Sequence, residues 1–238
     1  MDKKEVAAFF DQWAADWDAD MIRDDRKIGQ ILDAACVREG CSVLDVACGT
    51  GILCRILQES GMKAFGMDLS SGMIDIARQE NPHIRFDVAD MTTYRPDASF
   101  DLVTCTGDAL NHIENLEDVE TIFRNVYAYT APGGLFVFDI LNENEVSTSE
   151  PFEMDFDDHT RVWFQMTRPA ETKVNLKIRV FEDGRQRFEE NIRETVHDPA
   201  AVCRLLKNTG FEILRCADSL LDDGSHGTTW FVIGRKTK

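Results

Sequence analysis

The chain has 238 residues, of which 43% are hydrophobic and 29% are charged. This composition is typical of a globular protein with a substantial core, and it excludes a fibre or a disordered chain. The 43 acidic residues outnumber the 26 basic ones, which gives a formal net charge of −17. Because so acidic a surface repels phosphate backbones and anionic lipids, we expect no nucleic-acid partner and no membrane partner.

The N-terminal stretch MDKKEVAAFFDQWAADWDAD is polar and acidic, without the basic and then apolar pattern of a secretory signal. No run of residues is long and apolar enough for a membrane span. The seven cysteines form no C-x-x-C pair and have no His at metal-ligand spacing beside them, which argues against a disulfide framework or a zinc site. We therefore expect a cytoplasmic protein without a metal.

Apolar residues alternate between strand-like runs and helical spacing along the first part of the chain. Helices are predicted over 28–35, 52–57, 71–77 and 116–126, with Ser70 or Ser71 as the N-cap of the third. Strands are predicted at 41–46, 63–68, 84–88, 100–105 and 135–140. Repeated strand–helix units of this kind predict an α/β fold with a mainly parallel sheet.

The pattern changes after Asn142. Residues 160–196 alternate with a period of two across an Asp183-Gly184 turn, which predicts antiparallel strands. Asp198 followed by Pro predicts the start of a last helix, and two closing strands follow at 211–216 and 228–233. The expected division of the chain is one α/β domain made of 1–145 and 196–238, with 1–27 as a helical cap and 146–195 as an antiparallel insertion.

The most informative stretch is VLDVACGTG at 43–51. A strand that ends in small residues and turns into a helix brings backbone N–H groups to a ligand, and Gly49 and Gly51 leave room for its approach. The next strand ends at Asp68, whose carboxylate can accept hydrogen bonds from both hydroxyls of a ribose. The alternatives are purely structural, namely a tight turn for the glycines and a helix N-cap for Asp68.

Two nucleotide cofactors use this layout. The dinucleotide fingerprint requires a third small residue three positions after the second glycine, where this chain has Cys54. The turn instead reads ACGTG after Asp45, which resembles the first motif of class I S-adenosylmethionine-dependent methyltransferases, an acidic residue followed by G-x-G-x-G; Ala47 replaces the first glycine. The resemblance implies a seven-stranded Rossmann-like sheet and S-adenosyl-L-methionine as cofactor. An NAD-dependent oxidoreductase and a non-catalytic protein that binds this cofactor remain alternatives.

The resemblance extends to later strand ends. It implies that Asp68 holds the ribose, that Leu69 packs on the adenine, and that Asp90, beside Met91, accepts a hydrogen bond from the adenine amino group. The segment that starts at Cys105 would contact the methionine end, and an N-terminal helix reaching Trp17 would cover the cofactor. The full expected cofactor-binding set is Asp45, Ala47, Gly49, Gly51, Asp68, Leu69, Asp90, Met91, Cys105 and Trp17.

The methyl acceptor is harder to infer. Methyl transfer from a sulfonium requires an acceptor lone pair in line with the methyl group, so that a catalytic base is optional. His112 is the candidate base because imidazole titrates near neutrality, and Asp108 could bind a cationic amine. His112 or the adjacent Asn111 could instead be packed in the interior, and Asp108 could merely anchor its loop. A catechol-type metal site at Asp108, Asp139 and Asn142, and cysteine-dependent arsenite methylation, are further alternatives.

The insertion is the expected specificity element. In related small-molecule N- and O-methyltransferases such a piece forms an antiparallel lid over the acceptor pocket, sometimes shared within a homodimer. Trp163 and Phe164 would line that pocket or form the core of the lid, and Arg161, Arg168 or Arg179 would be available to an acidic substrate. The sequence thus predicts transfer of a methyl group from S-adenosylmethionine to an N or O atom of a small-molecule acceptor.

Overall fold

The computed structural model describes residues 3–17, 38–144, 146–155, 158–218 and 229–237. The predicted helix over 28–35 and the part of the N-terminal cap beyond residue 17 lie outside the described residues. Within the described part of the chain, no helix combines the length and apolarity that a membrane crossing requires.

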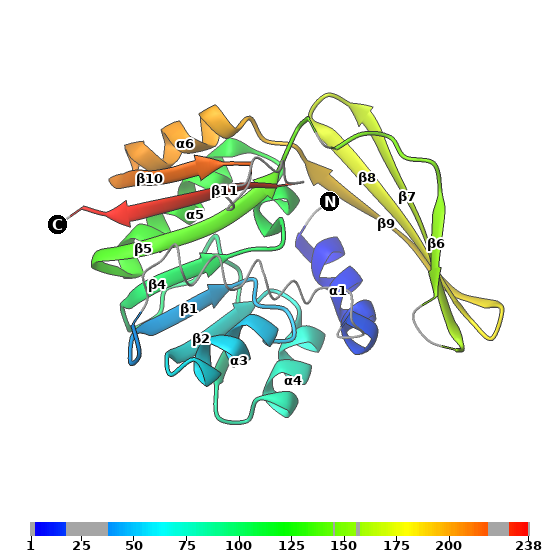
Figure 1. Cartoon of the computed structure of the whole chain (residues 1–238), viewed down its shortest axis with the longest axis horizontal. Coiled ribbons are helices and arrows are strands. Elements are labelled where there is room, and N and C mark those ends of the chain that lie inside the picture. The colour runs from blue at the N-terminus through cyan, green and yellow to red at the C-terminus, as the bar shows by residue number, and fades with distance from the viewer. Residues whose placement is uncertain (1–2, 18–37, 145, 156–157, 219–228, 238) are drawn as a thin grey trace.

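A seven-stranded sheet forms the centre of the molecule (Figure 1). Its strand order is β10-β11-β5-β4-β1-β2-β3, in which β11 pairs antiparallel with both of its neighbours and the other pairs are parallel. The strands are β1 (Ser42–Val46), β2 (Lys63–Asp68), β3 (Arg85–Val88), β4 (Phe100–Cys105), β5 (Thr130–Leu141), β10 (Phe211–Ala217) and β11 (Thr229–Lys236). The described helices are α1 (Lys3–Trp17), α3 (Ile52–Glu59), α4 (Ser71–Glu80), the 3-10 helix η1 (Ala109–His112), α5 (Leu116–Tyr129) and α6 (Pro199–Asn208).

Both faces of this sheet are buried, which explains why its strands are almost continuously apolar. Leu44 of β1 packs with buried residues of α5 and α6 on one face, whereas its neighbour Val43 packs with residues of α3 and α4 on the other. Helix starts follow the predicted caps: the Ser70 hydroxyl accepts from the Met73 N–H at 3.0 Å, and the Asp198 carboxylate caps α6.

A second, four-stranded antiparallel sheet follows β5 in the chain. Its strands, in sheet order, are β6 (Phe152–Asp155), β7 (Thr160–Ala170), β8 (Lys173–Glu182) and β9 (Arg185–Thr195). The β8–β9 turn is made by Asp183 and Gly184, both with positive φ (49° and 75°), as the predicted hairpin requires. The predicted fold class, an α/β Rossmann-like seven-stranded sheet with an antiparallel insertion between the fifth strand and the last helix, is confirmed.

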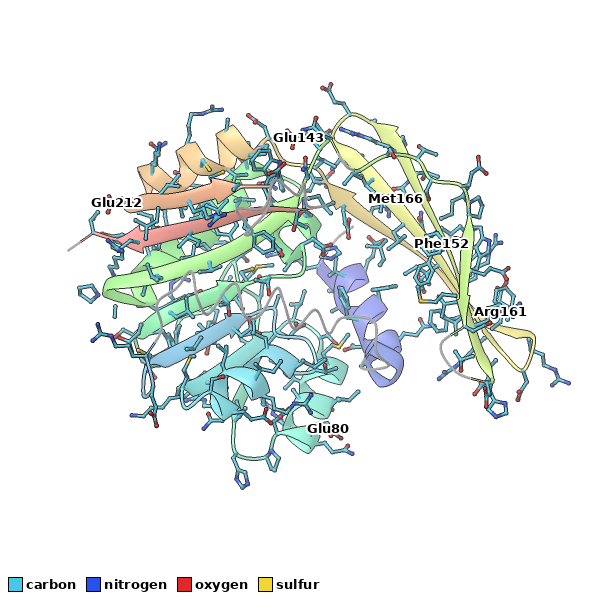
Figure 2. The ribbon with its side chains drawn as sticks, viewed as in Figure 1. Glu80, Glu143, Phe152, Arg161, Met166 and Glu212 are labelled. Carbon is cyan, nitrogen blue, oxygen red and sulfur yellow. The ribbon has the colours of Figure 1, made fainter. Side chains whose placement is uncertain are left out.

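Two details differ from the prediction. Strand β5 begins at Thr130 and not at residue 135, because the Pro-Gly-Gly segment forms a bulge within the strand: Thr130 pairs with Phe100, and the next pair is Leu135 with Leu102. Strand β6 was not predicted, because its alternation of apolar and acidic residues spans only four positions, and all four residues are exposed. Figure 2 shows Phe152 of β6 on the small sheet with Arg161 and Met166.

Helix α1 lies between the two sheets (Figure 1). One end docks on α4, where the Asp11 carboxylate accepts from the Ser70 hydroxyl at 2.6 Å and from the Gly72 N–H at 2.8 Å. Phe9 belongs to the buried apolar cluster of the small sheet, together with Phe164 and Ile178. The helix therefore closes the space between the strand ends of the large sheet and the inner face of the small one.

Candidate active site

A cavity of about 420 Å³ lies where the large sheet, α1 and the small sheet meet. This volume is within the range of about 300–1,000 Å³ typical of small-molecule sites. The loops that follow β1, β2, β3 and β4 form its floor, which is the usual ligand position in an open α/β sheet. Apolar side chains of the small sheet form the opposite wall, namely Phe164, Leu176, Ile178 and Ile192.

The loop after β1 approaches the cavity with an unusual backbone. Ala47, Gly49 and Gly51 all have positive φ, at 59°, 54° and 82°. Ala47 and Gly49 line the cavity, whereas Gly51 lies behind the loop at the start of α3. A side chain at Gly51 would place Cβ 2.8 Å from the Phe86 ring, so this glycine permits close helix–strand packing. Of the two glycines predicted to meet the cofactor, only Gly49 therefore borders the cavity.

Asp68 ties the end of β2 to this loop. Its carboxylate accepts from the Gly49 N–H at 2.9 Å and from the Ser70 N–H at 2.8 Å. Burial raises the pKa of Asp68, and these backbone N–H groups oppose that shift. The N-cap of α4 is Ser70, which excludes the alternative that Asp68 caps this helix. A carboxylate has about four acceptor sites, which leaves room for two ribose hydroxyls.

Asp45 is buried beneath the same loop and lines the cavity. Its Oδ1 accepts from the Thr104 hydroxyl at 2.7 Å. Burial raises the pKa of Asp45 to about 7, with Asp68 adding to the shift and the Thr104 hydroxyl opposing it. The side chain is thus a hydrogen-bonded buried acid that links β1 to β4.

Asp90 lies at the cavity beside α1. One carboxylate oxygen accepts from the Thr92 N–H and hydroxyl, and the other accepts from the Lys3 ammonium at 2.7 Å. Although burial raises the pKa of Asp90, these donors outweigh it, and the pKa is lowered overall. The adjacent Met91 and, after β2, Leu69 also line the cavity. An adenine amino group and the Lys3 ammonium of α1 would both donate hydrogen bonds to Asp90.

Three titratable side chains meet at the other end of the cavity. Single ligand-type atoms of Asp108, His112 and Glu194 all lie within 4.8 Å of one another. His112 Nε2 is 3.8 Å from Glu194 Oε1, and the Phe10 ring of α1 lies edge-on to the imidazole at 5.5 Å between centroids. Burial lowers the pKa of His112 to about 4 and raises the pKa of Glu194 to about 7.

Comparisons with known proteins agree on one family. Residues 43–134 match the family model described as a methyltransferase domain. The chain is 28% identical over 192 residues to the methyltransferase candidate YqeM of Bacillus subtilis, covering 76% of this chain and 77% of that one. It is 30% identical over 155 residues to the ubiquinone biosynthesis O-methyltransferase of Coxiella burnetii, covering 60% of this chain and 64% of that one.

A solved S-adenosylmethionine-dependent methyltransferase from Clostridium acetobutylicum superposes with a TM-score of 0.81 at 22% identity, over 95% of this chain and 98% of that one. A SAM-bound amino pentose methyltransferase from Micromonospora echinaspora has a TM-score of 0.78 at 20% identity, over 94% and 96%. Residues 43–134 thus form a methyltransferase domain, and the fold of the chain is that of class I S-adenosylmethionine-dependent methyltransferases. The solved neighbour from Micromonospora echinaspora is SAM-bound, and the positive-φ loop and the Asp68 carboxylate of this chain fit the nucleoside of S-adenosyl-L-methionine.

Three predicted site residues of the methyltransferase do not reach the cavity within the described structure. Asn111 is fully buried: its amide donates to the Thr195 carbonyl at 2.7 Å and accepts from the Leu141 N–H at 3.0 Å. Cys105 is buried in the core on the last position of β4, and Thr106, the next residue, borders the cavity in its place. Gly51 is the third. The side chain of Trp17 lies outside the described residues.

The sequence reading missed Glu194. The residue lies on β9, where the alternation puts it on the same face as the buried Ile192, and it borders the cavity with 8% of its surface exposed. An acidic residue in the apolar register of an alternating strand is the signal that could have found it, because carboxylates are rarely buried without a partner.

The catechol-type alternative loses support. Asp139 Oδ1 accepts from the backbone N–H of Asp108 at 2.8 Å, and Asn142 Oδ1 accepts from the backbone N–H of Asn144 at 3.1 Å. Asp139 and Asn142 thus hold loop backbone, and neither borders the cavity. Asp108, the third residue of that set, faces His112 and Glu194 instead.

Proposed function

We propose that this methyltransferase transfers the methyl group of S-adenosylmethionine to an N or O atom of a small-molecule acceptor. The observation that carries the proposal is the continuity of the cavity, which joins the strand ends of the large sheet to a cluster of acidic and imidazole side chains beneath the small sheet. Donor and acceptor would share one enclosed space. Neighbours in fold include an amino pentose methyltransferase, which agrees with a small acceptor.

When bound, the donor supplies an electrophilic methyl group on a sulfonium. In our proposal Asp68 holds the ribose, Leu69 and Met91 border the adenine, and the Ala47–Gly49 backbone lies against the methionine part. Holding the two reactants in line can contribute about 7–11 kcal/mol to the lowering of the barrier. Phe10, Phe164 and Ile178 form apolar walls that exclude water from the point of transfer.

The arginines of the small sheet do not favour an acidic acceptor. Arg161 pairs with Asp155 at 2.6 Å, Arg168 donates to backbone carbonyls, and Arg179 pairs with Glu189 while lying over the Trp163 ring at 4.3 Å. Lys3 is the one Lys or Arg among the described residues that line the cavity, and its ammonium is bound by Asp90. We infer that the acceptor is neutral or cationic.

The test uses the purified protein, labelled S-adenosylmethionine and an extract of small metabolites. We expect label to enter at least one compound that is absent from a reaction with heat-denatured protein, and S-adenosylhomocysteine to raise the melting temperature more than NAD does. Stabilisation by S-adenosylhomocysteine with no transfer of label would instead indicate the non-catalytic alternative.

A further inference from the structure

The cluster of Asp108, His112 and Glu194 is assembled from two distant parts of the chain. Asp108 is the N-cap of η1 and His112 is its last residue, and Glu194 comes from β9 of the small sheet. Two buried contacts lock these segments together directly after Glu194 in the chain. The Asn111 amide donates to the Thr195 carbonyl at 2.7 Å, and the His197 imidazole bonds the Ile113 carbonyl at 2.9 Å. The position of Glu194 at the cavity is therefore fixed by buried hydrogen bonds.

His112 and Glu194 do not satisfy each other. The 3.8 Å separation between His112 Nε2 and Glu194 Oε1 is too long for a hydrogen bond. His112 Nδ1 is buried and has no hydrogen-bond partner among the described residues. The imidazole and the Glu194 carboxylate are each about nine-tenths buried, where an unmet polar group costs about 1–3 kcal/mol. His112 and Glu194 therefore present buried acceptors to a ligand that donates hydrogen bonds.

We propose that the acceptor is a primary or secondary amine, and that Glu194 binds its ammonium group and takes its proton. This proposal rests on the proposed function. A primary ammonium has three N–H donors, and the Glu194 carboxylate and the neutral His112 imidazole offer it acceptors within one cluster. A hydroxyl has one donor and would leave acceptors unmet, and an anionic group would be repelled. A metal ion is disfavoured, because a ligating His normally donates its second ring N–H to a partner.

Glu194 suits the role of base better than His112. A base works best when its pKa lies near the working pH. Burial raises the pKa of Glu194 to about 7, whereas burial lowers the pKa of His112 to about 4. Among the described residues, the charged side chains nearby are paired: Lys173 of β8 pairs with Glu114, Arg193 of β9 pairs with Glu5 of α1, and Lys3 pairs with Asp90. The charge of the N-terminus adds to the lowering of the His112 pKa by burial.

The ammonium gives one proton to the Glu194 carboxylate, so that an N–H bond breaks and an O–H bond forms. The freed nitrogen lone pair then attacks the methyl carbon, an N–C bond forms, and the S–C bond breaks with its electron pair remaining on sulfur. The products are S-adenosylhomocysteine and a methylated ammonium, and Glu194 returns its proton to solvent when the site opens.

The experiment compares two metabolite extracts, one untreated and one in which primary and secondary amines have been capped by an amine-selective acetylating ester. With the parent protein we expect label from S-adenosylmethionine in the untreated extract and its loss in the capped one. Equal labelling of both extracts would support the proposed function and overturn the amine assignment. Labelling of neither would contradict the proposed function, and with it this inference.

The role of Glu194 is tested by Glu194→Gln, with Glu189→Gln on the exposed face of the same strand as the matched control. We expect Glu194→Gln to slow transfer about 10²–10⁴-fold, the usual contribution of an acid–base group. Its affinity for S-adenosylhomocysteine, measured by calorimetry, should equal that of the parent and thereby report correct folding. Glu189→Gln should transfer at the parent rate.

Parent-like transfer by Glu194→Gln would overturn the assignment. A metal control completes the design, because the same cluster contains residue types that also ligate cations. Transfer should be unaffected by chelator and by added Mg²⁺, Mn²⁺ or Zn²⁺. If transfer required one of these ions, and Glu194→Gln lost its dependence on that ion, the cluster would be a metal site and the ammonium assignment would be wrong.

Discussion

The two ends of the cavity are built in different ways. At the donor end, the polar groups follow successive strands of one sheet, and the Asp68 carboxylate is held by backbone of adjacent strand ends: it accepts from the N–H of Ser70, two residues on, and from that of Gly49 in the loop after β1. At the acceptor end, the contact that sets the geometry joins Asn111 to Thr195, 84 residues away. The donor end is thus a product of local motif, and the acceptor end is a product of tertiary packing.

Each end also contains one buried carboxyl group whose pKa is raised to about 7, and the comparison separates their roles. Asp45 accepts a 2.7 Å hydrogen bond from Thr104 and joins two strands. Glu194 instead faces His112 across 3.8 Å in an apolar wall. A buried acid with a protein donor stabilises the fold, whereas one that faces an open cavity without a close donor is poised for a ligand.

The largest effect that we expect at the donor end comes from Gly51→Ala. This position has φ of +82°, and the new Cβ would lie 2.8 Å from the Phe86 ring and 3.3 Å from Ala77. The left-handed backbone costs about 1–2 kcal/mol and overpacking about 1–3 kcal/mol, so the free energy of unfolding should fall by about 2–5 kcal/mol. Urea denaturation measures the loss.

Gly184→Ala is the matched control for that substitution. Gly184 has a similar φ of +75°, and a Cβ there would meet nothing within 4 Å. It should show the backbone cost of about 1–2 kcal/mol without the packing cost. Equal losses for the two variants would mean that Gly51 contributes through its backbone alone and that the helix–strand packing of the donor end is more adaptable than the structure indicates.

Asp68→Ala tests whether the donor end binds the nucleoside as proposed. Hydrogen bonds to a charged group contribute about 1.5–3 kcal/mol, so the variant should bind S-adenosylhomocysteine about 100-fold more weakly in calorimetry. Asp75→Ala, an exposed change on α4, should bind as the parent does. Unchanged affinity in Asp68→Ala would remove the ribose assignment and leave Asp68 as a tie to the glycine loop.

Prediction from the sequence succeeded mainly at the donor end of the cavity and failed mainly at the acceptor end. The sheet, the caps at Ser70 and Asp198, and the Asp68 carboxylate at the cavity followed from period, spacing and the ACGTG turn. Glu194 could not be found in that way, because its burial depends on how the small sheet folds back over η1. The structural roles of Asn111 and Gly51 likewise depend on partners that only the folded chain supplies, Thr195 and Phe86.

At the acceptor end, the substitution Glu194→Gln should change how the stability of the protein depends on pH. Because burial raises the folded-state pKa of Glu194 from 4.5 to about 7, the folded protein retains a proton that the unfolded chain releases in this window. The contribution of Glu194 to stability is therefore present below pH 4.5 and is lost as pH rises through 7, a change on the order of 1–3 kcal/mol. Melting temperatures from pH 5 to pH 8 measure it.

The sign of this pH effect is clearest in the difference in stability between the variant and the parent. His112, with a pKa lowered to about 4, makes the opposite contribution in both proteins, because its buried neutral ring loses stability as pH falls below 6.5. Glu194→Gln should thus gain stability relative to the parent as pH rises from 5 to 8. A constant difference across that range would show that Glu194 is hydrated in the folded protein and unsuited to act as a neutral-pH base.

The smallest expected effect concerns the link between α1 and the donor end. The Lys3 ammonium is 2.7 Å from Asp90, but its side chain is 46% exposed, and exposed ion pairs contribute about 0.2–1 kcal/mol. Lys3→Met should therefore weaken S-adenosylhomocysteine binding by no more than about fivefold, and Lys63→Met on β2 should not change it. A loss far above fivefold would mean that donor binding depends on the tertiary docking of α1, and the donor end would then resemble the acceptor end in how it is built.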